Sequence, residues 1–121
     1  MEQEYIKGDI VIYNNKIHTI MDTLELNNYE LSYISHQVHQ LELSGVPLTP
    51  EILEKNGWKK YCYGSLYRSP NEEGAVVGLS SQTGYVWKAH IGGRLLRSNI
   101  NSVSDLQHLL FGLGLNSEME V

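Results

Sequence analysis

The sequence predicts an α+β fold with an N-terminal small-barrel-like β subregion, a short helix, an antiparallel four-stranded β-meander and a C-terminal amphipathic helix. Short runs of branched and aromatic residues recur between turn residues, which is typical of β-strands. Two other segments carry complete helix start and stop signals. The 121 residues, 41% of them hydrophobic, are enough for one core. We therefore expect a single compact domain over residues 1–121, with a β subregion at 1–47 and a helix-meander-helix subregion at 48–121.

The N-terminal subregion begins with a predicted β-hairpin. Residues 10–13 and 17–21 are rich in branched side chains, and the asparagines between them tolerate the positive φ of tight hairpin turns. Gly8-Asp9 marks the bend that enters the hairpin. Residues 23–34 predict one or two strands broken at Asn27-Asn28, and residues 36–43 predict another strand.

The short helix follows at residues 49–57. Thr49 is a suitable N-cap, and Pro50 fits the first helical position, where its missing N–H is not needed. Gly57 supplies the left-handed residue that ends the helix. Leu48 and Leu53 have the spacing of a hydrophobic staple, and Trp58 is placed to fold back onto the apolar side of the helix.

The meander is predicted from the regular spacing of turns between aromatic and branched segments. The turns fall at residues 69–74, at 80–84 and at Gly92-Gly93, and Gly64 predicts an irregularity inside the first strand. The four strands are expected near residues 61–67, 75–79, 85–91 and 95–100.

The C-terminal helix has the clearest amphipathic pattern. Ser102 caps it, Asp105 completes an acidic version of the capping box, and Gly114 ends it. One apolar face is formed by residues at helical spacing: Val103, Leu106, Leu109, Leu110 and Leu113.

The cellular setting is predicted to be cytoplasmic. No apolar run approaches the roughly 20 residues that cross a bilayer, so no membrane partner is expected. The acidic stretch Met1–Glu4 lacks the basic-then-apolar layout of a signal peptide. The single cysteine, Cys62, cannot form an internal disulfide, which fits a reducing compartment, and we interpret it as a packed strand residue.

Charge is unevenly distributed along the chain, whose net charge is −5. Residues 1–54 hold nine carboxylates and two lysines, whereas residues 55–97 hold seven basic residues and only the carboxylates of Glu72 and Glu73. This asymmetry predicts either a local surface that attracts anions or charge pairing between two halves of the molecule or two subunits.

The basic and aromatic meander is the candidate ligand-binding site. Guanidinium groups bind phosphate bidentately, and aromatic faces stack on bases. In this hypothesis Lys88, Arg94 and Arg97 hold phosphate, while Tyr61 and Trp87 stack on a base. The alternative is that the rings are core residues and the lysines cover the other face. The candidate residues are Lys59, Lys60, Tyr61, Arg68, Trp87, Lys88, His90, Arg94 and Arg97.

No catalytic residue, metal site or cofactor is predicted. His36 and His39 would point to opposite faces of a strand and could not hold one ion. No serine lies in a Gly-X-Ser-X-Gly elbow, and the glycines do not form a phosphate-binding fingerprint.

Three motifs together carry a resemblance. They are Gly8-Asp9-Ile10-Val11, the segment from Pro47 to Trp58, and Val103-Ser104-Asp105-Leu106-Gln107-His108-Leu109-Leu110-Phe111-Gly112-Leu113. With these motifs the chain resembles a group of small proteins from Bacteroidetes phages, prophages and mobile elements. The resemblance implies a phage or mobile-element source and a bacterial host cell, and it implies no catalytic residue. Because Ser104-Asp105 stand where the group has histidine and glutamate, polar roles there are not carried over.

We therefore expect a non-catalytic phage or mobile-element accessory protein that acts by binding. Its sharpest form is a counter-defence protein that sequesters an anionic, nucleotide-type signal, at a site that a homo-oligomer would help to build. Long nucleic acid is not an expected partner of so acidic a chain. Two alternatives remain open: a protein–protein interaction module that inhibits or recruits a host or phage protein, and a small nucleotide hydrolase.

Overall fold

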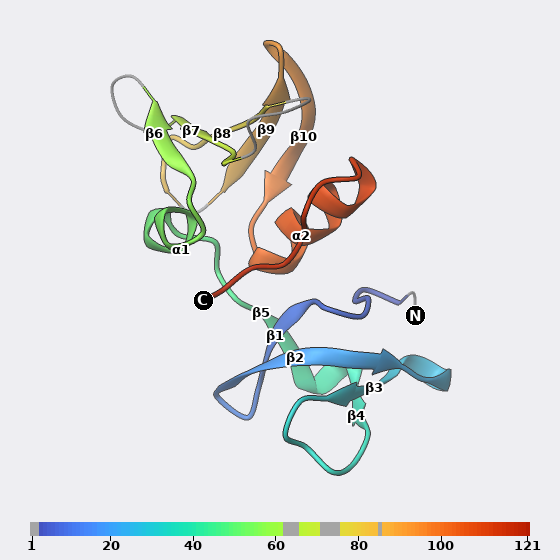
Figure 1. The fold of residues 1–121 in the computed structure, drawn as a ribbon. Coiled ribbons are helices and arrows are strands. Elements are labelled where there is room, and N and C mark those ends of the chain that lie inside the picture. Colours follow the sequence, from blue (N-terminus) through green and yellow to red (C-terminus); the bar gives the residue numbers. More distant parts are fainter. Residues whose placement is uncertain (1–2, 62–65, 71–75, 85) are drawn as a thin grey trace. The chain divides into compact units, whose positions relative to one another are not determined.

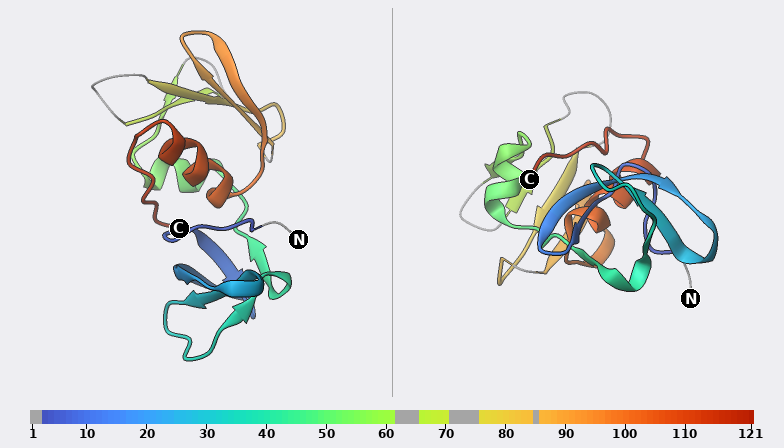
Figure 2. Two further views of the ribbon diagram at one scale, coloured as in Figure 1. Left: turned by 90° about the vertical axis from the view of Figure 1, so that its right-hand side faces the viewer. Right: turned by 90° about the horizontal axis from the view of Figure 1, so that it is seen from below.

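The computed structural model describes residues 3–61, 66–70, 76–84 and 86–121. These residues form two α-helices and ten strands in two antiparallel five-stranded sheets, which confirms the predicted α+β class (Figure 1). The chain divides into two compact units. Residues 1–46 and 102–118 form what we call the half-barrel unit, and residues 47–101 and 119–121 form the meander unit. Figure 2 shows the same ribbon from two further sides.

The half-barrel unit contains a curled sheet with the strand order β4-β3-β2-β1-β5. Its strands are β1 (Ile10–Tyr13), β2 (Lys16–Thr23), β3 (Asn28–Leu31), β4 (Val38–His39) and β5 (Leu43–Gly45). The predicted hairpin is β1–β2, and Asn14 and Asn15 form its turn with φ of 52° and 63°. The sheet therefore confirms the small-barrel-like N-terminal subregion.

The core of the half-barrel unit lies inside the curl of this sheet. It contains Tyr5, Val11, Ile20, Tyr29, Leu31 and Val38, all of them buried. The rings of Tyr5 and Tyr29 meet edge to face with centroids 5.8 Å apart, and the Tyr29 hydroxyl donates a hydrogen bond to Oε1 of Gln40 at 2.6 Å. The phenol is thus buried with its polar atom satisfied.

The single strand predicted over residues 36–43 is wrong. The segment forms β4, a 3₁₀ turn at Gln40–Glu42 and then β5. The His39 ring nitrogen Nδ1 accepts a hydrogen bond from Leu41 N, and the Glu42 carboxylate accepts one from His39 N, both at 3.1 Å. These local side-chain bonds cap the turn and compete with a continuous ladder. A second 3₁₀ turn, Glu25–Asn27, separates β2 from β3 and confirms the predicted break.

The helix α2 (Val103–Gly112) has the predicted capping box at its start. The Ser102 hydroxyl accepts from Asp105 N at 3.2 Å, and the Asp105 carboxylate accepts from Ser102 N at 3.3 Å. The sequence placed this helix in one subregion with the meander, whereas its contacts group it with the strands of the half-barrel unit. Buried Gln107 bonds α2 to the start of β1, since its Oε1 accepts from Ile10 N and its Nε2 donates to Gly8 O, both at 2.9 Å. That the whole chain is one domain stays a prediction.

The meander unit contains α1 (Pro50–Lys55) and five strands rather than the predicted four. They are β6 (Lys59–Tyr61), β7 (Leu66–Arg68), β8 (Val77–Ser80), β9 (Trp87–Ile91) and β10 (Arg94–Ile100), in the order β10-β9-β8-β7-β6. The additional strand comes from the first predicted strand, because the segment expected to form one strand forms the antiparallel pair β6 and β7. The predictions made for Cys62 and Gly64, for the turn at 71–74 and for the ends of strands at Ala75 and Tyr85 lie outside the described residues.

The short helix α1 confirms its predicted signals. Thr49 Oγ1 accepts from Ile52 N at 3.3 Å, and Pro50 occupies the first turn. Gly57 adopts φ of 84°, a conformation that strongly favours glycine, and Trp58 N returns to the Leu53 carbonyl at 3.0 Å.

The core of the meander unit lies on one face of the sheet. Trp87 is 1% exposed, and its indole Nε1 donates to the Leu48 carbonyl at 2.9 Å. Its ring meets that of Tyr67 edge to face at 5.8 Å. Further buried residues on the unit's strands are Val77, Leu79, Ala89 and Ile100.

Backbone hydrogen bonds join the chain segments where each unit begins and ends. In the half-barrel unit, Val103 N donates to Val46 O at 2.8 Å. In the meander unit, Leu48 N donates to Asn101 O at 3.2 Å. The Asn56 side chain pairs with the backbone of Glu120 through two bonds of 2.8 Å.

None of the helices in the described ranges is long and apolar enough to cross a membrane.

Gln107→Leu should destabilise the half-barrel unit. The substitution leaves the buried N–H of Ile10 and the carbonyl of Gly8 without their partner, at a cost of about 2–3 kcal/mol in the free energy of unfolding. Urea unfolding followed by circular dichroism measures it. Gln37→Leu, at an exposed position of the same unit, is the matched control and should change stability by less than about 0.5 kcal/mol. Equal effects of the two changes would contradict the assigned role of Gln107.

Stability should fall at alkaline pH. Burial raises the pKa of Tyr5, Tyr29 and Tyr67 above the ordinary value of 10.0, and the charges of Glu54 and Glu51 raise that of Tyr67 further. The neutral phenols therefore stabilise the folded state fully below the unfolded pKa of 10.0, and this stabilisation is lost as the pH rises toward the higher folded pKa. Tyrosinate absorbance should show a late-titrating fraction that disappears on unfolding. A single ordinary titration of all eight tyrosines would contradict the expectation.

Candidate functional site

The face of the meander sheet opposite the core carries two rows of side chains. Residues that oppose each other across antiparallel strands lie on the same face. One row runs through Lys59, Arg68, Gly78, His90 and Leu95, and the other runs through Tyr61, Leu66, Ser80 and Lys88. Alternate strand residues, such as Tyr67, Leu79 and Ala89, are buried on the core face. We call the face with the two rows the open face.

A cavity of about 450 Å³ lies on the open face. Tyr61, Arg68 and His90 contribute to its wall, and Gly78 lies between Arg68 and His90 in the register. A glycine inside a strand leaves room for another group to approach the backbone closely. A Cβ at Gly78 would meet Leu66 Cδ1 at 3.6 Å, an ordinary contact, so no steric conflict requires glycine here. We call this space the arginine cavity.

Arg68 is the cation of the arginine cavity. Its guanidinium carbon lies 5.2 Å from the centroid of the Tyr61 ring, a cation–π geometry that orients the planar group. Tyr61 is 48% exposed, so ligands can reach the ring. Within the described part of the chain, Arg68 forms no ion pair with a carboxylate. An oriented guanidinium without an anionic partner is a suitable binding group for phosphate or carboxylate.

Charge on the meander strands has a single sign. The five strands contain six basic residues and no aspartate or glutamate. Three of the basic residues, Lys59, Arg68 and Lys88, lie in the rows of the open face. The carboxylates that the described residues of this unit do contain are in α1 and near the C-terminus, at Glu51, Glu54 and Glu120. The sheet therefore favours anions.

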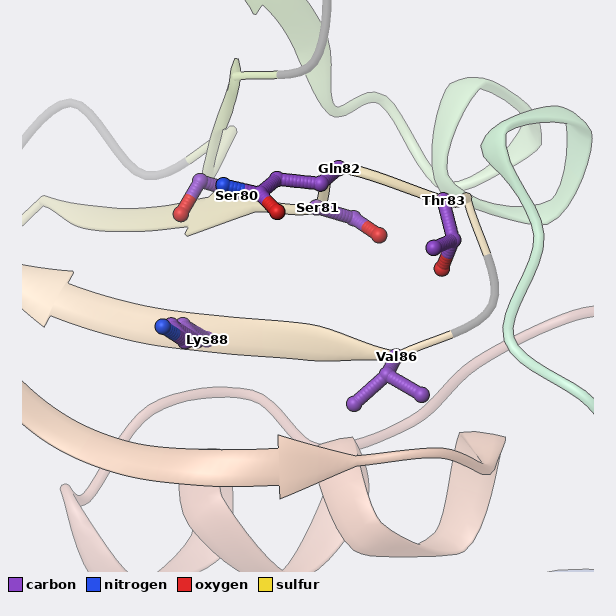
Figure 3. A pocket seen from close by; sticks show the side chains of 6 residues that line it. All are labelled: Ser80, Ser81, Gln82, Thr83, Val86 and Lys88. Carbon is purple, nitrogen blue, oxygen red and sulfur yellow. The ribbon is translucent and has the colours of Figure 1, made fainter.

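A second cavity of about 420 Å³ lies beside the connection between β8 and β9 (Figure 3). Lys88 contributes its amine from β9, and Ser80 contributes a hydroxyl from the end of β8. The loop adds polar side chains and Val86 adds an apolar one. Ser81 is buried, and its hydroxyl accepts a hydrogen bond from Gly84 N at 2.8 Å, which holds the loop in its turn. The remaining polar lining residues are Gln82 and Thr83. We call this space the lysine cavity.

A serine–histidine contact joins the walls of the two cavities. Ser80 lines the lysine cavity and His90 lines the arginine cavity, and Ser80 Oγ lies 3.1 Å from His90 Nε2. This is the distance at which a histidine can accept a proton from a serine hydroxyl. No carboxylate among the described residues is placed against His90 as a third member.

The structure brings together five of the nine predicted site residues on the open face. These are Lys59, Tyr61, Arg68, Lys88 and His90. Lys60 opposes the buried Tyr67 and so lies in register with the core face. Arg94 and Arg97 lie on β10, where they oppose Ile91 and Ala89 of β9. Neither arginine lines the arginine cavity or the lysine cavity.

Trp87 is not available for stacking on a ligand. Its indole is buried with its N–H bonded to Leu48 O, so the alternative interpretation of this ring as a core residue is the correct one. Tyr61 is exposed, as the stacking hypothesis requires. Residue type alone does not tell which of these two aromatic rings is exposed. The pairing register of the strands decides it.

Sequence reasoning missed Gly78 and the polar residues of the lysine cavity. Gly78 had a detectable signal, because a glycine inside an otherwise branched segment leaves one position of the strand without a side chain. Ser80, Ser81, Gln82 and Thr83 were interpreted only as a turn, since nothing in their composition distinguishes a lining loop from a connecting one.

No group of three or more potential metal ligands occurs among the residues that the structure describes. His39 caps the 3₁₀ turn through Nδ1, and His36 Nε2 lies 3.4 Å from the Tyr13 hydroxyl. In the half-barrel unit, His108 Nε2 lies 2.5 Å from the buried carboxylate of Asp9. This carboxylate also accepts from Ile6 N at 2.9 Å, which gives it a structural role at the start of β1.

Comparison with known protein families, with characterised proteins and with solved structures finds no match to this chain. The resemblance to phage and mobile-element proteins therefore stays a prediction that rests on the three motifs.

Proposed function

We propose that the chain is a non-catalytic binding protein whose ligand is a phosphorylated molecule with a planar ring, of the nucleotide type. The observation that carries the proposal is the arginine cavity, where Arg68 lies over the exposed ring of Tyr61 with no carboxylate among the described residues to neutralise it. Phosphate suits the planar donors of the guanidinium, and an aromatic base suits the tyrosine face.

The electrostatics of the sheet support an anionic ligand over a neutral one. Strands that contain six basic residues and no acidic ones raise the local concentration of anions, even though the chain as a whole carries −5. A small ligand is favoured over a long polyanion, because the acidic half-barrel unit holds nine carboxylates against two lysines.

The biological role that fits such a protein in a bacterial cell is sequestration of a nucleotide-type signal as a counter-defence function. This part of the proposal rests on the resemblance of three motifs to phage and mobile-element proteins.

Arg68→Ala should weaken nucleotide binding. Loss of a charge-assisted hydrogen bond to phosphate costs about 1.5–3 kcal/mol, so the dissociation constant should rise about tenfold to a hundredfold. Isothermal titration calorimetry with a panel of nucleotides at low salt measures it. Arg94→Ala removes the same charge from a strand position outside both cavities, and it should change the dissociation constant by less than about threefold.

Gly78→Val provides a test that removes no charge. The new side chain fills the space between Arg68 and His90, so binding should be lost while the melting temperature stays close to that of the parent chain. The proposal is overturned if no nucleotide of the panel binds the parent chain, or if Arg94→Ala weakens binding as much as Arg68→Ala does.

A second candidate function, a small nucleotide hydrolase, is favoured by one observation. Ser80 Oγ and His90 Nε2 lie 3.1 Å apart next to the arginine cavity, which is the arrangement of a nucleophile and its base. Under this alternative, the parent chain turns over a nucleotide, and Ser80→Ala and His90→Ala each abolish turnover. Binding without turnover by the parent chain would exclude the alternative and leave the binding proposal standing.

A further inference from the structure

The two cavities belong to one continuous surface. Ser80 and His90, which are in contact, line one cavity each. Lys88 and His90 are two residues apart on β9 and both belong to the rows of the open face. A ligand long enough to occupy both cavities would therefore pass over the Ser80–His90 contact.

A cation stands at each end of this surface. Arg68 and Lys88 are separated by two strand spacings across the sheet and by two residues along it. With neighbouring strands about 4.8 Å apart and a rise of about 3.4 Å per residue, their Cα atoms lie roughly 12 Å apart. Rotation of the two long side chains lets the charged groups approach each other more closely than this. In the part of the chain that is described, neither cation forms an ion pair.

The lining of the lysine cavity differs from that of the arginine cavity. It combines one amine with the hydroxyls of Ser80 and Thr83, the amide of Gln82 and the apolar side chain of Val86 (Figure 3). An amine with neighbouring hydroxyl and amide donors suits a phosphate and the sugar attached to it. The exposed aromatic ring lies on the arginine side, at Tyr61.

We infer that the ligand is of the dinucleotide class, with one phosphate at Arg68, its base on Tyr61, and the second phosphate and sugar in the lysine cavity. The inference rests on the proposed function and adds to it that a mononucleotide occupies only half of the site. Two anion-binding positions on one surface favour a ligand with two separated charges, because the second contact is made at no further cost in translational freedom.

The test compares two probes on three variants by isothermal titration calorimetry at low salt. The probes are adenosine monophosphate and the linear dinucleotide of adenosine with a terminal phosphate, so that one anionic group or two are offered. Lys88→Gln should weaken binding of the dinucleotide about tenfold and change that of the mononucleotide less than twofold. Arg68→Ala should weaken both. Lys60→Gln, the matched control on the core-face register of the same sheet, should change neither.

The outcomes distinguish failure of the second binding position from failure of nucleotide binding as a whole. If the dinucleotide and the mononucleotide bind equally well, or if Lys88→Gln affects them equally, the second position is wrong and the proposed function still stands. If neither these probes nor cyclic dinucleotides bind the parent chain, both fall. A cyclic dinucleotide that binds more tightly than the linear one, with the same response to Lys88→Gln, supports the inference and identifies the ring-closed form as the preferred ligand.

Discussion

The hydrogen bond from the Trp87 indole to the Leu48 carbonyl is the contact on which the geometry of the meander unit depends. It satisfies the polar atom of a fully buried ring, and it fixes which face of β9 is turned toward the core. Once Trp87 faces inward, strand alternation turns Lys88 outward, and the next outward residue is His90. Antiparallel pairing passes the same orientation to β8 and β7, so that Ser80, Gly78 and Arg68 share the open face. The candidate site is therefore a consequence of how one tryptophan is packed.

Local signals in the sequence were sufficient where a few neighbouring residues decide the structure. The caps of both helices, the asparagine turn of the first hairpin and the Gly92-Gly93 turn are all present as predicted, because each depends on φ preferences or on side-chain bonds within three or four residues. The strand predicted over residues 36–43 failed for a related reason. The capping bonds of His39 with Leu41 and Glu42 are also local, but histidine is an uncommon N-cap residue and its role is not evident from residue type. The bonds of Gln107 to Ile10 and Gly8 join α2 to the half-barrel strands across a long sequence separation, which no local pattern reports.

The candidate site was predictable in its composition and not in its arrangement. The concentration of basic and aromatic residues between Lys59 and Arg97 predicted a site on this sheet, and among the described residues the two cavities lie there. Which of those residues share a face depends on register, and a shift by one residue would exchange Lys59 with Lys60 and Lys88 with Trp87. Register in turn depends on pairing between strands that are distant in sequence. Gly78 was overlooked because a binding surface can be formed by the absence of a side chain as well as by its presence.

The hydrogen bonds at the borders of the units give the topology a modular character. The chain leaves the half-barrel unit at Val46 and returns at Ser102, and the bond from Val103 N to Val46 O holds these two points together. Within the meander unit, the bond from Leu48 N to Asn101 O holds together the segment before α1 and the segment after β10. A module whose two ends lie close can be inserted into a host fold without stretching it. Residues 47–101 thus have the connectivity of an inserted segment, and the bonds of Asn56 to Glu120 add the end of the chain to the same unit.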